Sequence, residues 1–328
     1  MVDRVSEESL YWKIYLREAR LPGFVRDYLD GLADLSLTTR YEYMKEIELF
    51  LDYLIDHQIV NKKVPVHIES KDLSALSEAD IKDYLQWTSR YEREFITRSG
   101  KKTVQEFRNG PRGKERKRVV LYNLFQHLVE KRLLEHNPVK RIRIEVSKVS
   151  ETPTLTRFEV HQMLEVAKSH PDPFLGLRNY VIIKLLAYTG IRIGELVGLN
   201  LDDIWRERDE MIVTRIDGEG DVILIPDVVR DDLYEYHDAR KNIENVQAGH
   251  ENAMFLSQQM RRIAPRSVRK MLRKVGNLAG VKTPITPQVF RKTYGKWEYE
   301  RTGDMHEVAE QLGYSSVQTF KQTILEKE

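Results

Sequence analysis

The stretch that decides the fold is Ala187-Tyr188-Thr189-Gly190-Ile191-Arg192-Ile193-Gly194-Glu195-Leu196-Val197-Gly198-Leu199, followed by Asp202-Asp203-Ile204. It continues an apolar segment, 179–188, that we expect to be helical. One arginine and one glutamate, three residues apart, stand in this otherwise apolar run. Arg192 can therefore be a structural cation that binds Glu195 or a backbone carbonyl. Alternatively, its guanidinium contacts a phosphate group of a ligand.

Helices and one hairpin are expected on both sides of this stretch. Thr156-Arg157-Phe158-Glu159 is a helix-capping signal that predicts a helix to about Lys168. Residues 211–214 and 222–225 are rich in β-branched and apolar side chains, and a turn with two glycines, 217–221, separates them. This pattern predicts a β-hairpin between Glu210 and Pro226. The second half of the chain is thus predicted to be mainly α with a small sheet.

The first half has helical signals throughout. Ser36 precedes apolar residues at helical spacing, and further helices are expected over 77–95 and 103–131. Asn137-Pro138 supplies a stop signal. Residues 141–155 have mixed charge and no periodicity, which is typical of an exposed connector. We therefore predict a helical domain over 1–145, a linker over 146–155 and a second domain over 156–328.

Length and composition limit the classes of function. A chain of 328 residues has material for two packed domains. It contains no cysteine, which excludes disulfides, thiolate catalysis and thiolate zinc sites and suits a reducing cytosol. The histidines lack metal-ligand spacing, and the acidic turn around Glu219 is too short for a calcium loop. We expect no metal, no cofactor, no membrane segment and a cytoplasmic location.

Two clusters of basic residues suggest a nucleic-acid partner. Between Arg90 and Arg143 there are 16 Lys or Arg residues against 6 Glu and no Asp, although the whole chain carries a formal charge of only +2. The second cluster, 261–274, contains no acidic residue. Such clusters can be solvated helix faces, but one in each domain favours contact with DNA phosphates. The predicted contacts are Lys101, Lys102, Arg112, Lys114, Arg116, Lys117, Arg118, Arg261, Arg262, Arg266, Arg269 and Lys270.

The stretch 187–199 resembles the first catalytic-arginine box of the tyrosine recombinase, or phage integrase, family. The order of later motifs agrees: the hairpin, Met254-Phe255-Leu256-Ser257, Thr286-Pro287-Gln288-Val289-Phe290-Arg291 and Leu312-Gly313-Tyr314. The resemblance covers roughly 38–323. It implies a SAM-like helical core-binding domain and a recombinase-like α domain. It also implies that Arg192 and Arg291 hold a DNA phosphate, for which the planar guanidinium fork is suited.

Four positions depart from the catalytic set that the resemblance implies. The position of the family's hairpin lysine is occupied by Glu219. The position of the histidine that precedes the second arginine is occupied by Gln288, whose side chain cannot exchange a proton near neutral pH. Tyr314 occupies the position of a later histidine, and Thr323 stands where the nucleophilic tyrosine belongs. A threonine hydroxyl needs a base to become a nucleophile, and the matched positions supply none. We expect Tyr314 to pack its ring against the second arginine.

These departures favour a DNA-binding protein without recombinase activity. The leading hypothesis is a sequence-specific repressor of a phage or mobile element, associated with the bacterial nucleoid and similar to recombinase-like lysogeny repressors of temperate Bacillus phages. Two alternatives remain open: an active site-specific recombinase or integrase, and an accessory DNA-binding partner of one. Self-association on DNA also stays open, although the sequence ends where active relatives often continue into a helix exchanged between subunits, so exchange through that helix is not expected.

Overall fold

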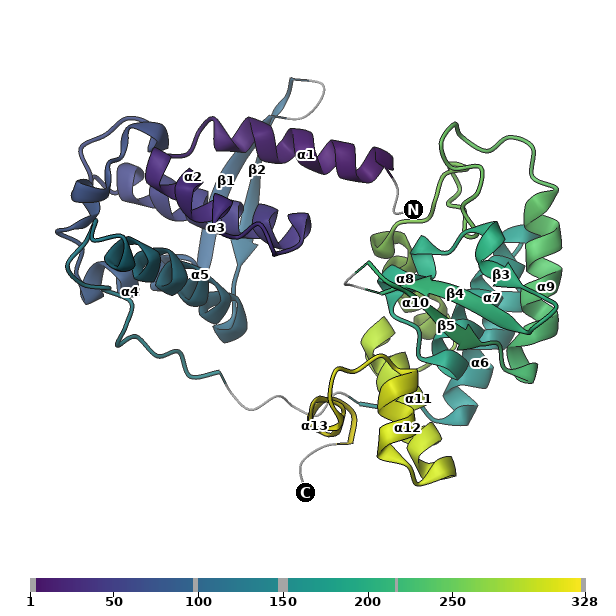
Figure 1. Ribbon diagram of the computed structural model, residues 1–328. Coiled ribbons are helices and arrows are strands. Elements are labelled where there is room, and N and C mark those ends of the chain that lie inside the picture. Colours follow the sequence, from purple (N-terminus) through teal and green to yellow (C-terminus); the bar gives the residue numbers. More distant parts are fainter. Residues whose placement is uncertain (1–3, 97–99, 147–152, 216–217, 326–328) are drawn as a thin grey trace. The chain divides into compact units, whose positions relative to one another are not determined.

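The chain forms two compact units, Met1–Val149 and Ser150–Glu328, in the computed structural model shown in Figure 1. The structure describes residues 4–96, 100–146, 153–215 and 218–325. The division between the units falls within the linker predicted at 146–155, of which 147–152 lie outside the described residues. Both units are mainly helical and each carries a small antiparallel sheet, which confirms the predicted fold class.

Unit 1 is a helical domain with one hairpin. Its elements are α1 (Arg4–Glu18), α2 (Gly23–Asp30), α3 (Leu37–Asp56), η1 (Pro65–His67), η2 (Ser70–Leu73), α4 (Glu78–Trp87), β1 (Arg90–Ile96), β2 (Lys102–Arg108) and α5 (Pro111–Glu130). Ser36 caps α3, as predicted, by accepting a hydrogen bond from the Thr39 amide. The core centres on Phe50 of α3, whose ring makes edge-to-face contacts with Tyr84 and Phe125.

The prediction that the first 140 residues are all helical is wrong. The helix expected over 77–95 ends at Trp87, and the one expected from 103 begins at Pro111. The residues between them form the antiparallel β1–β2 hairpin, with Tyr91 opposite Phe107. These two rings stack at 5.2 Å, and Trp87 stacks on Tyr91 at 4.8 Å. Aromatic residues at alternate positions stabilise a strand pair more than the intervening charges favour a helix.

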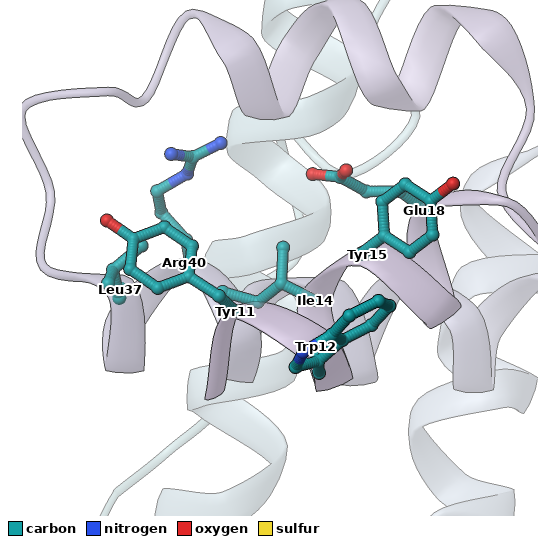
Figure 2. A pocket seen from close by; sticks show the side chains of 7 residues that line it. All are labelled: Tyr11, Trp12, Ile14, Tyr15, Glu18, Leu37 and Arg40. Atoms are coloured by element: carbon teal, nitrogen blue, oxygen red, sulfur yellow. The ribbon is translucent and has the colours of Figure 1, made fainter. Parts of the chain in front are cut away.

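An apolar groove lies along α1. This helix packs on α3 with Ile14 buried, whereas Tyr11, Trp12 and Tyr15 are each more than half exposed. Figure 2 shows these rings near Leu37 and Arg40 of α3, where they line a groove of about 650 Å³. Trp12 and Tyr15 also meet edge to face at 5.8 Å. Unit 1 therefore exposes an aromatic surface as well as its charges.

Unit 2 surrounds a central helix. Its elements are α6 (Arg157–Lys168), α7 (Pro173–Thr189), α8 (Ile193–Gly198), η3 (Leu201–Asp203), β3 (Ile204–Trp205), β4 (Glu210–Thr214), β5 (Gly220–Leu224), α9 (Asp227–Lys241), α10 (Pro265–Leu278), α11 (Pro287–Thr302), α12 (Met305–Gln311), α13 (Val317–Phe320) and the π turn η4 (Lys321–Leu325). The predicted capping of α6 by Thr156 and the predicted hairpin are both confirmed.

Helix α7 is the central element of unit 2. It packs against α6, α9 and α11, so it is buried on nearly all sides and extends the apolar segment predicted at 179–188. Asp172 caps its N-terminus through the Leu175 amide, 3.0 Å away. Gly190 ends it in the left-handed conformation, with φ +62°. A side chain at Gly190 would also collide with Tyr294 and Leu312. Glycine is therefore required both by the backbone conformation and by the lack of space.

The C-terminal segment packs on its own unit. Phe320 and Ile324 are fully buried in a small cluster with Val308, Ala309 and Leu312. Gly295 of α11 allows this close approach, because a Cβ atom there would lie 2.8 Å from Ile324 and 3.1 Å from Leu312. In the part of the chain that the structure describes, we find no helix with the length and apolarity that a membrane span requires.

We expect Gly295→Ala to lower the free energy of unfolding by about 1–2 kcal/mol, because the added methyl group is too close to Ile324 and Leu312, where the C-terminal segment packs on α11. Denaturant unfolding monitored by circular dichroism measures this change. Gly194→Ala is the matched control, since a Cβ atom there meets nothing within 4 Å. Helix propensity alone would make the control neutral or stabilising by about 1 kcal/mol, and equal effects of the two substitutions would contradict the packing argument.

Candidate functional site

Arg192 and Glu195 are held by the start of α8. Arg192 is the N-cap residue, and its backbone amide donates to Glu195 Oε2 at 2.8 Å. Its side chain donates from Nη1 to Glu195 Oε1 at 2.9 Å and from Nη2 to the Gly313 carbonyl at 2.8 Å. Both contacts of the structural interpretation, a carboxylate and a carbonyl, are thus present. About a quarter of the Arg192 side chain stays exposed.

Glu195 is the buried anion of the site, with its side chain only 2% exposed. Burial by itself raises the pKa of a carboxyl group. Here the Arg192 amide and the guanidiniums of Arg192 and Arg215 outweigh burial and hold the pKa of Glu195 below its usual value. The carboxylate therefore stays charged and ties together two cations from different elements.

Arg215 is the site residue that the sequence analysis missed. It directly follows strand β4 and donates to Glu195 Oε1 at 2.9 Å and to Asp221 Oδ2 at 2.7 Å. Its third contact is the Gln311 carbonyl at 3.3 Å. Burial disfavours its charge, but the two carboxylates raise the pKa of Arg215 above its usual value. No short-range pattern pointed to it, because its partners lie 6, 20 and 96 residues away along the chain.

Arg291 reaches the same region from α11 and is almost fully buried. Nη1 donates to the Gly190 carbonyl at 2.8 Å, and Nη2 donates to the Leu312 carbonyl. Burial lowers the pKa of this guanidinium, the neighbouring Arg192 charge lowers it further, and Tyr314 opposes both. The positive charges of Arg192 and Arg291 repel each other at this short separation, which favours the binding of an anion between or beside them.

The Tyr314 ring lies near the Arg291 guanidinium, as expected, and also near that of Arg192. The carbon centres of the Arg192 and Arg291 guanidiniums lie 5.9 Å and 5.0 Å from the ring centroid. The Tyr314 ring also contacts the Phe320 ring, edge to face, with the centroids 5.8 Å apart. These cation–π contacts stabilise the paired cations and join them to the buried C-terminal segment.

The other three substituted positions are exposed. Glu219 lies at the hairpin turn, where its carbonyl accepts from the Arg215 amide at 2.8 Å. Gln288 lies in the first turn of α11, and Thr323 lies in η4. Among the described residues, no partner accepts a hydrogen bond from the Thr323 hydroxyl. The structure therefore brings together Arg192, Arg291 and Tyr314, and within the part of the chain that it describes no hydrogen bond activates Thr323.

The basic cluster of unit 1 is largely paired with acids. Arg116 binds Glu42, and Arg118 binds Glu115 through two bonds of 2.7 Å. Lys102 lies 3.4 Å from Glu94 on the β-hairpin. Lys114 donates to the Gln86 side chain at 3.0 Å, and Lys101 and Arg112 are exposed.

One residue of that cluster was assigned wrongly. The prediction that Lys117 contacts DNA is wrong, because its side chain is 5% exposed and forms an ion pair with Glu46 of α3. The helical periodicity of α5 turns Lys117 toward the core, and the count of positive charges could not reveal its direction.

The second cluster divides into a structural cation and an exposed stripe. Arg262 donates to the carbonyls of Val197, Gly198 and Leu199 at 2.9 Å each, so it caps the C-terminus of α8 instead of facing solvent. The stripe consists of exposed residues at helical spacing on α10, and no carboxylate of the described residues pairs with it. Its members are Arg266, Arg269, Lys270, Arg273 and Lys274.

We expect Glu195→Gln to destabilise unit 2 by about 3 kcal/mol at neutral pH, because it removes the buried carboxylate that Arg192 and Arg215 share and leaves Arg215 only Asp221 as an anion. The pKa of Glu195 is lower in the folded than in the unfolded chain. The contribution of Glu195 to the free energy of unfolding is therefore complete above the ordinary carboxyl pKa of 4.5. That contribution is lost as the pH falls through the folded-state value. Denaturant unfolding at a series of pH values should show the gap between wild type and variant narrowing in acid.

Glu300→Gln is the matched control for this experiment, since Glu300 is exposed on α11. It should leave the free energy of unfolding within about 0.5 kcal/mol of wild type. A gap between wild type and Glu195→Gln that stayed constant down to strongly acidic pH would contradict the ion-pair argument.

Known proteins resemble this chain over most of its length. The tyrosine recombinase XerS of Streptococcus agalactiae serotype III is 26% identical over an alignment of 350 positions, which covers 96% of this chain and 94% of the relative. The tyrosine recombinase XerC of Alcanivorax borkumensis is 27% identical over 214 residues, covering 65% of this chain and 69% of the relative.

Solved structures agree on the fold. A crystal structure of the XerH site-specific recombinase bound to its difH substrate has a TM-score of 0.64 at 16% identity, covering 91% of this chain and 80% of that one. The model of the phage integrase family matches residues 153–323, just over half of the sequence. The match contains the two-arginine site and confirms the resemblance seen in residues 187–199. The chain belongs to the phage integrase family.

Proposed function

We propose that the chain is a sequence-specific protein that binds double-stranded DNA without cutting it. In this proposal it represses transcription of a phage or mobile element by occupying a promoter at the nucleoid. One observation carries the proposal. Arg192 and Arg291 both contact the Tyr314 ring, while Glu219, Gln288 and Thr323 stand where the resemblance places groups that attack a phosphate and move its protons.

The arginine pair is suited to receive a DNA phosphate. A guanidinium has five N–H donors; protein oxygens take two on Arg192, and on Arg291 they take three, from the Gly190 and Leu312 carbonyls and the Tyr314 hydroxyl. These bonds fix the plane of each fork and leave further donors for an anion. The charges of the two forks oppose each other, so a bound phosphate would relieve the repulsion that lowers the pKa of Arg291.

The α10 stripe supplies the second part of the proposed interface. Its cations have no carboxylate partner among the described residues, so their charge is available to phosphates. Arg262, just ahead of α10, caps one end of α8, and Arg192 is the N-cap at the other end. Helix α8 therefore connects the segment that leads into the α10 stripe to the arginine pair, which fixes their relative positions within unit 2.

Strand cleavage needs more than phosphate binding. The reaction requires an activated nucleophile and a proton donor for the leaving oxygen. Thr323 is exposed, and no hydrogen bond joins its hydroxyl to a base among the described residues. In this proposal the site binds the phosphodiester and leaves its bonds intact.

A specific observation supports a second candidate function, an active recombinase that uses Tyr314. This hydroxyl belongs to a ring that contacts both arginines, and the relatives cited above are named tyrosine recombinases. Against it, the Tyr314 ring supports the cations from a position that lies nine residues before the expected nucleophile. The repressor proposal follows from the loss of catalytic groups combined with retained DNA contacts.

We expect the triple variant Arg266→Gln, Arg269→Gln, Lys270→Gln to bind duplex DNA more weakly and with a shallower salt dependence. Each phosphate contact contributes about one power of salt to the affinity, so the slope should fall by about one for each contact removed. Fluorescence anisotropy at several salt concentrations measures both quantities. The probe is a labelled duplex that the wild-type chain has selected from a random-sequence library.

Arg230→Gln is the control for charge loss, because Arg230 is paired with Asp227 and Asp231 on α9. It should leave the slope unchanged. A triple variant with the slope of wild type would argue against phosphate contact by α10.

We expect no covalent protein–DNA adduct when the wild-type chain is mixed with nicked duplexes that trap cleavage intermediates. Denaturing gel electrophoresis with labelled DNA detects such adducts. An adduct that disappears in Tyr314→Phe would establish the active recombinase instead. A promoter reporter in the presence of this chain alone then tests repression, and repression that requires a second recombinase would indicate an accessory partner.

A further inference from the structure

We propose that Arg215 is a positioning residue that offsets the charge of Glu195 and so preserves the positive potential of the Arg192–Arg291 pair. This inference rests on the proposed function, in which that pair receives a DNA phosphate. Arg215 comes from the end of β4, so the β-hairpin would tune the site without touching the ligand.

The contacts of Arg215 explain why it does not itself reach a phosphate. Nε and Nη2 bind Asp221, Nη1 binds Glu195, and Nη2 also faces the Gln311 carbonyl. The side chain is only 10% exposed. All three nitrogens of the guanidinium are therefore occupied by protein oxygens, in contrast to the more exposed Arg192.

The arrangement of charges gives Arg215 its role. Arg192 Nη1 and Arg215 Nη1 bind the same oxygen of Glu195, each at 2.9 Å. The cluster holds three cations, Arg192, Arg215 and Arg291, and two anions, Glu195 and Asp221. It thus has one net positive charge. Without Arg215 the anions would balance the two remaining arginines, and the attraction for a phosphate would fall.

The backbone is built to admit this side chain. Gly313 has φ +61°, and a Cβ atom there would lie 2.9 Å from the central carbon of the Arg215 guanidinium. The carbonyl of the same glycine accepts from Arg192 at 2.8 Å. One turn therefore contacts Arg215 on one side and orients Arg192 on the other. A larger residue at 313 would separate the hairpin from the arginine pair.

The hairpin carries a cation at a different position from the one expected by resemblance. The family lysine position falls at Glu219, whereas Arg215 lies four residues earlier. A lysine on a turn can extend to a ligand, but a buried arginine with three protein partners cannot. We infer that the hairpin of this chain contributes electrostatic support in place of proton transfer.

Arg215→Gln tests this inference, because glutamine removes the charge and keeps a hydrogen-bond donor. We expect affinity for the selected duplex to fall about tenfold, as one uncompensated charge near the site implies. The slope of affinity against salt should stay as in wild type, since no phosphate contact is lost. Arg215→Lys keeps the charge but gives up the two-nitrogen contact with Asp221; because the inference assigns the role to the charge, binding should stay within about threefold of wild type.

The double variant Glu195→Gln, Arg215→Gln separates charge from folding. It restores one net positive charge, so we expect it to recover most of the affinity lost in Arg215→Gln. Arg230→Gln serves again as the control for loss of a paired arginine on the same unit. Circular dichroism and thermal unfolding establish that each variant is folded. If Arg215→Gln does not fold, Arg215→Lys and the double variant decide the question.

Distinct outcomes overturn the two proposals. If the wild-type chain selects no duplex, the proposed function fails. If wild type binds but Arg215→Gln behaves like Arg230→Gln, the inference about Arg215 fails alone. A salt slope that drops by about one in Arg215→Gln would mean direct phosphate contact instead of positioning. A folded double variant that binds no better than Arg215→Gln would exclude charge compensation.

Discussion

The buried carboxylate of Glu195 is the constraint on which the site depends. An isolated carboxylate is unstable away from water, so it has to be met by cations and donors. Arg192 supplies one cation and an amide from its own helix start, and Arg215 supplies the second cation from the hairpin. Helix α8, the β-hairpin and the turn at Gly313 are consequently fixed together. The positions of Arg192 and Arg215 follow from their shared bonds to Glu195, whereas Arg291 is held by the Gly190 and Leu312 carbonyls.

The bonds that hold the arginines of the site do not depend on the groups that would carry out strand cleavage. Protein oxygens hold part of each guanidinium of Arg192 and Arg291, which orients the remaining donors without the help of a ligand. Such preorganisation serves phosphate binding whether or not a bond is broken. In the proposed function, the groups of cleavage chemistry that the resemblance places at Glu219, Gln288 and Thr323 can be lost while the framework of the site stays intact.

Burial and pairing change how the charges of the chain should be interpreted. Lys117 and Arg262 look like surface cations in the sequence, yet one is buried against Glu46 and the other caps α8. The α10 stripe has no acidic partner among the described residues, because its neighbours on the same face are also basic. Charge counting thus located the basic segments, but only some of their members are exposed without an acidic partner. The aromatic groove along α1 shows that apolar surface was overlooked in the same way.

The sequence by itself determined the mainly helical class, the family box at 187–199, the caps at Ser36 and Thr156 and the hairpin between Glu210 and Pro226. These features arise from contacts between residues a few positions apart, which a linear pattern records. Only the tertiary structure decided that 90–108 forms a hairpin, that Lys117 points inward and that Arg215 joins Glu195. Each of these depends on partners far along the chain, where Phe107 stacks on Tyr91, Glu46 meets Lys117 and Gln311 faces Arg215. Packing of distant segments sets the direction of a side chain, and no local pattern contains that information.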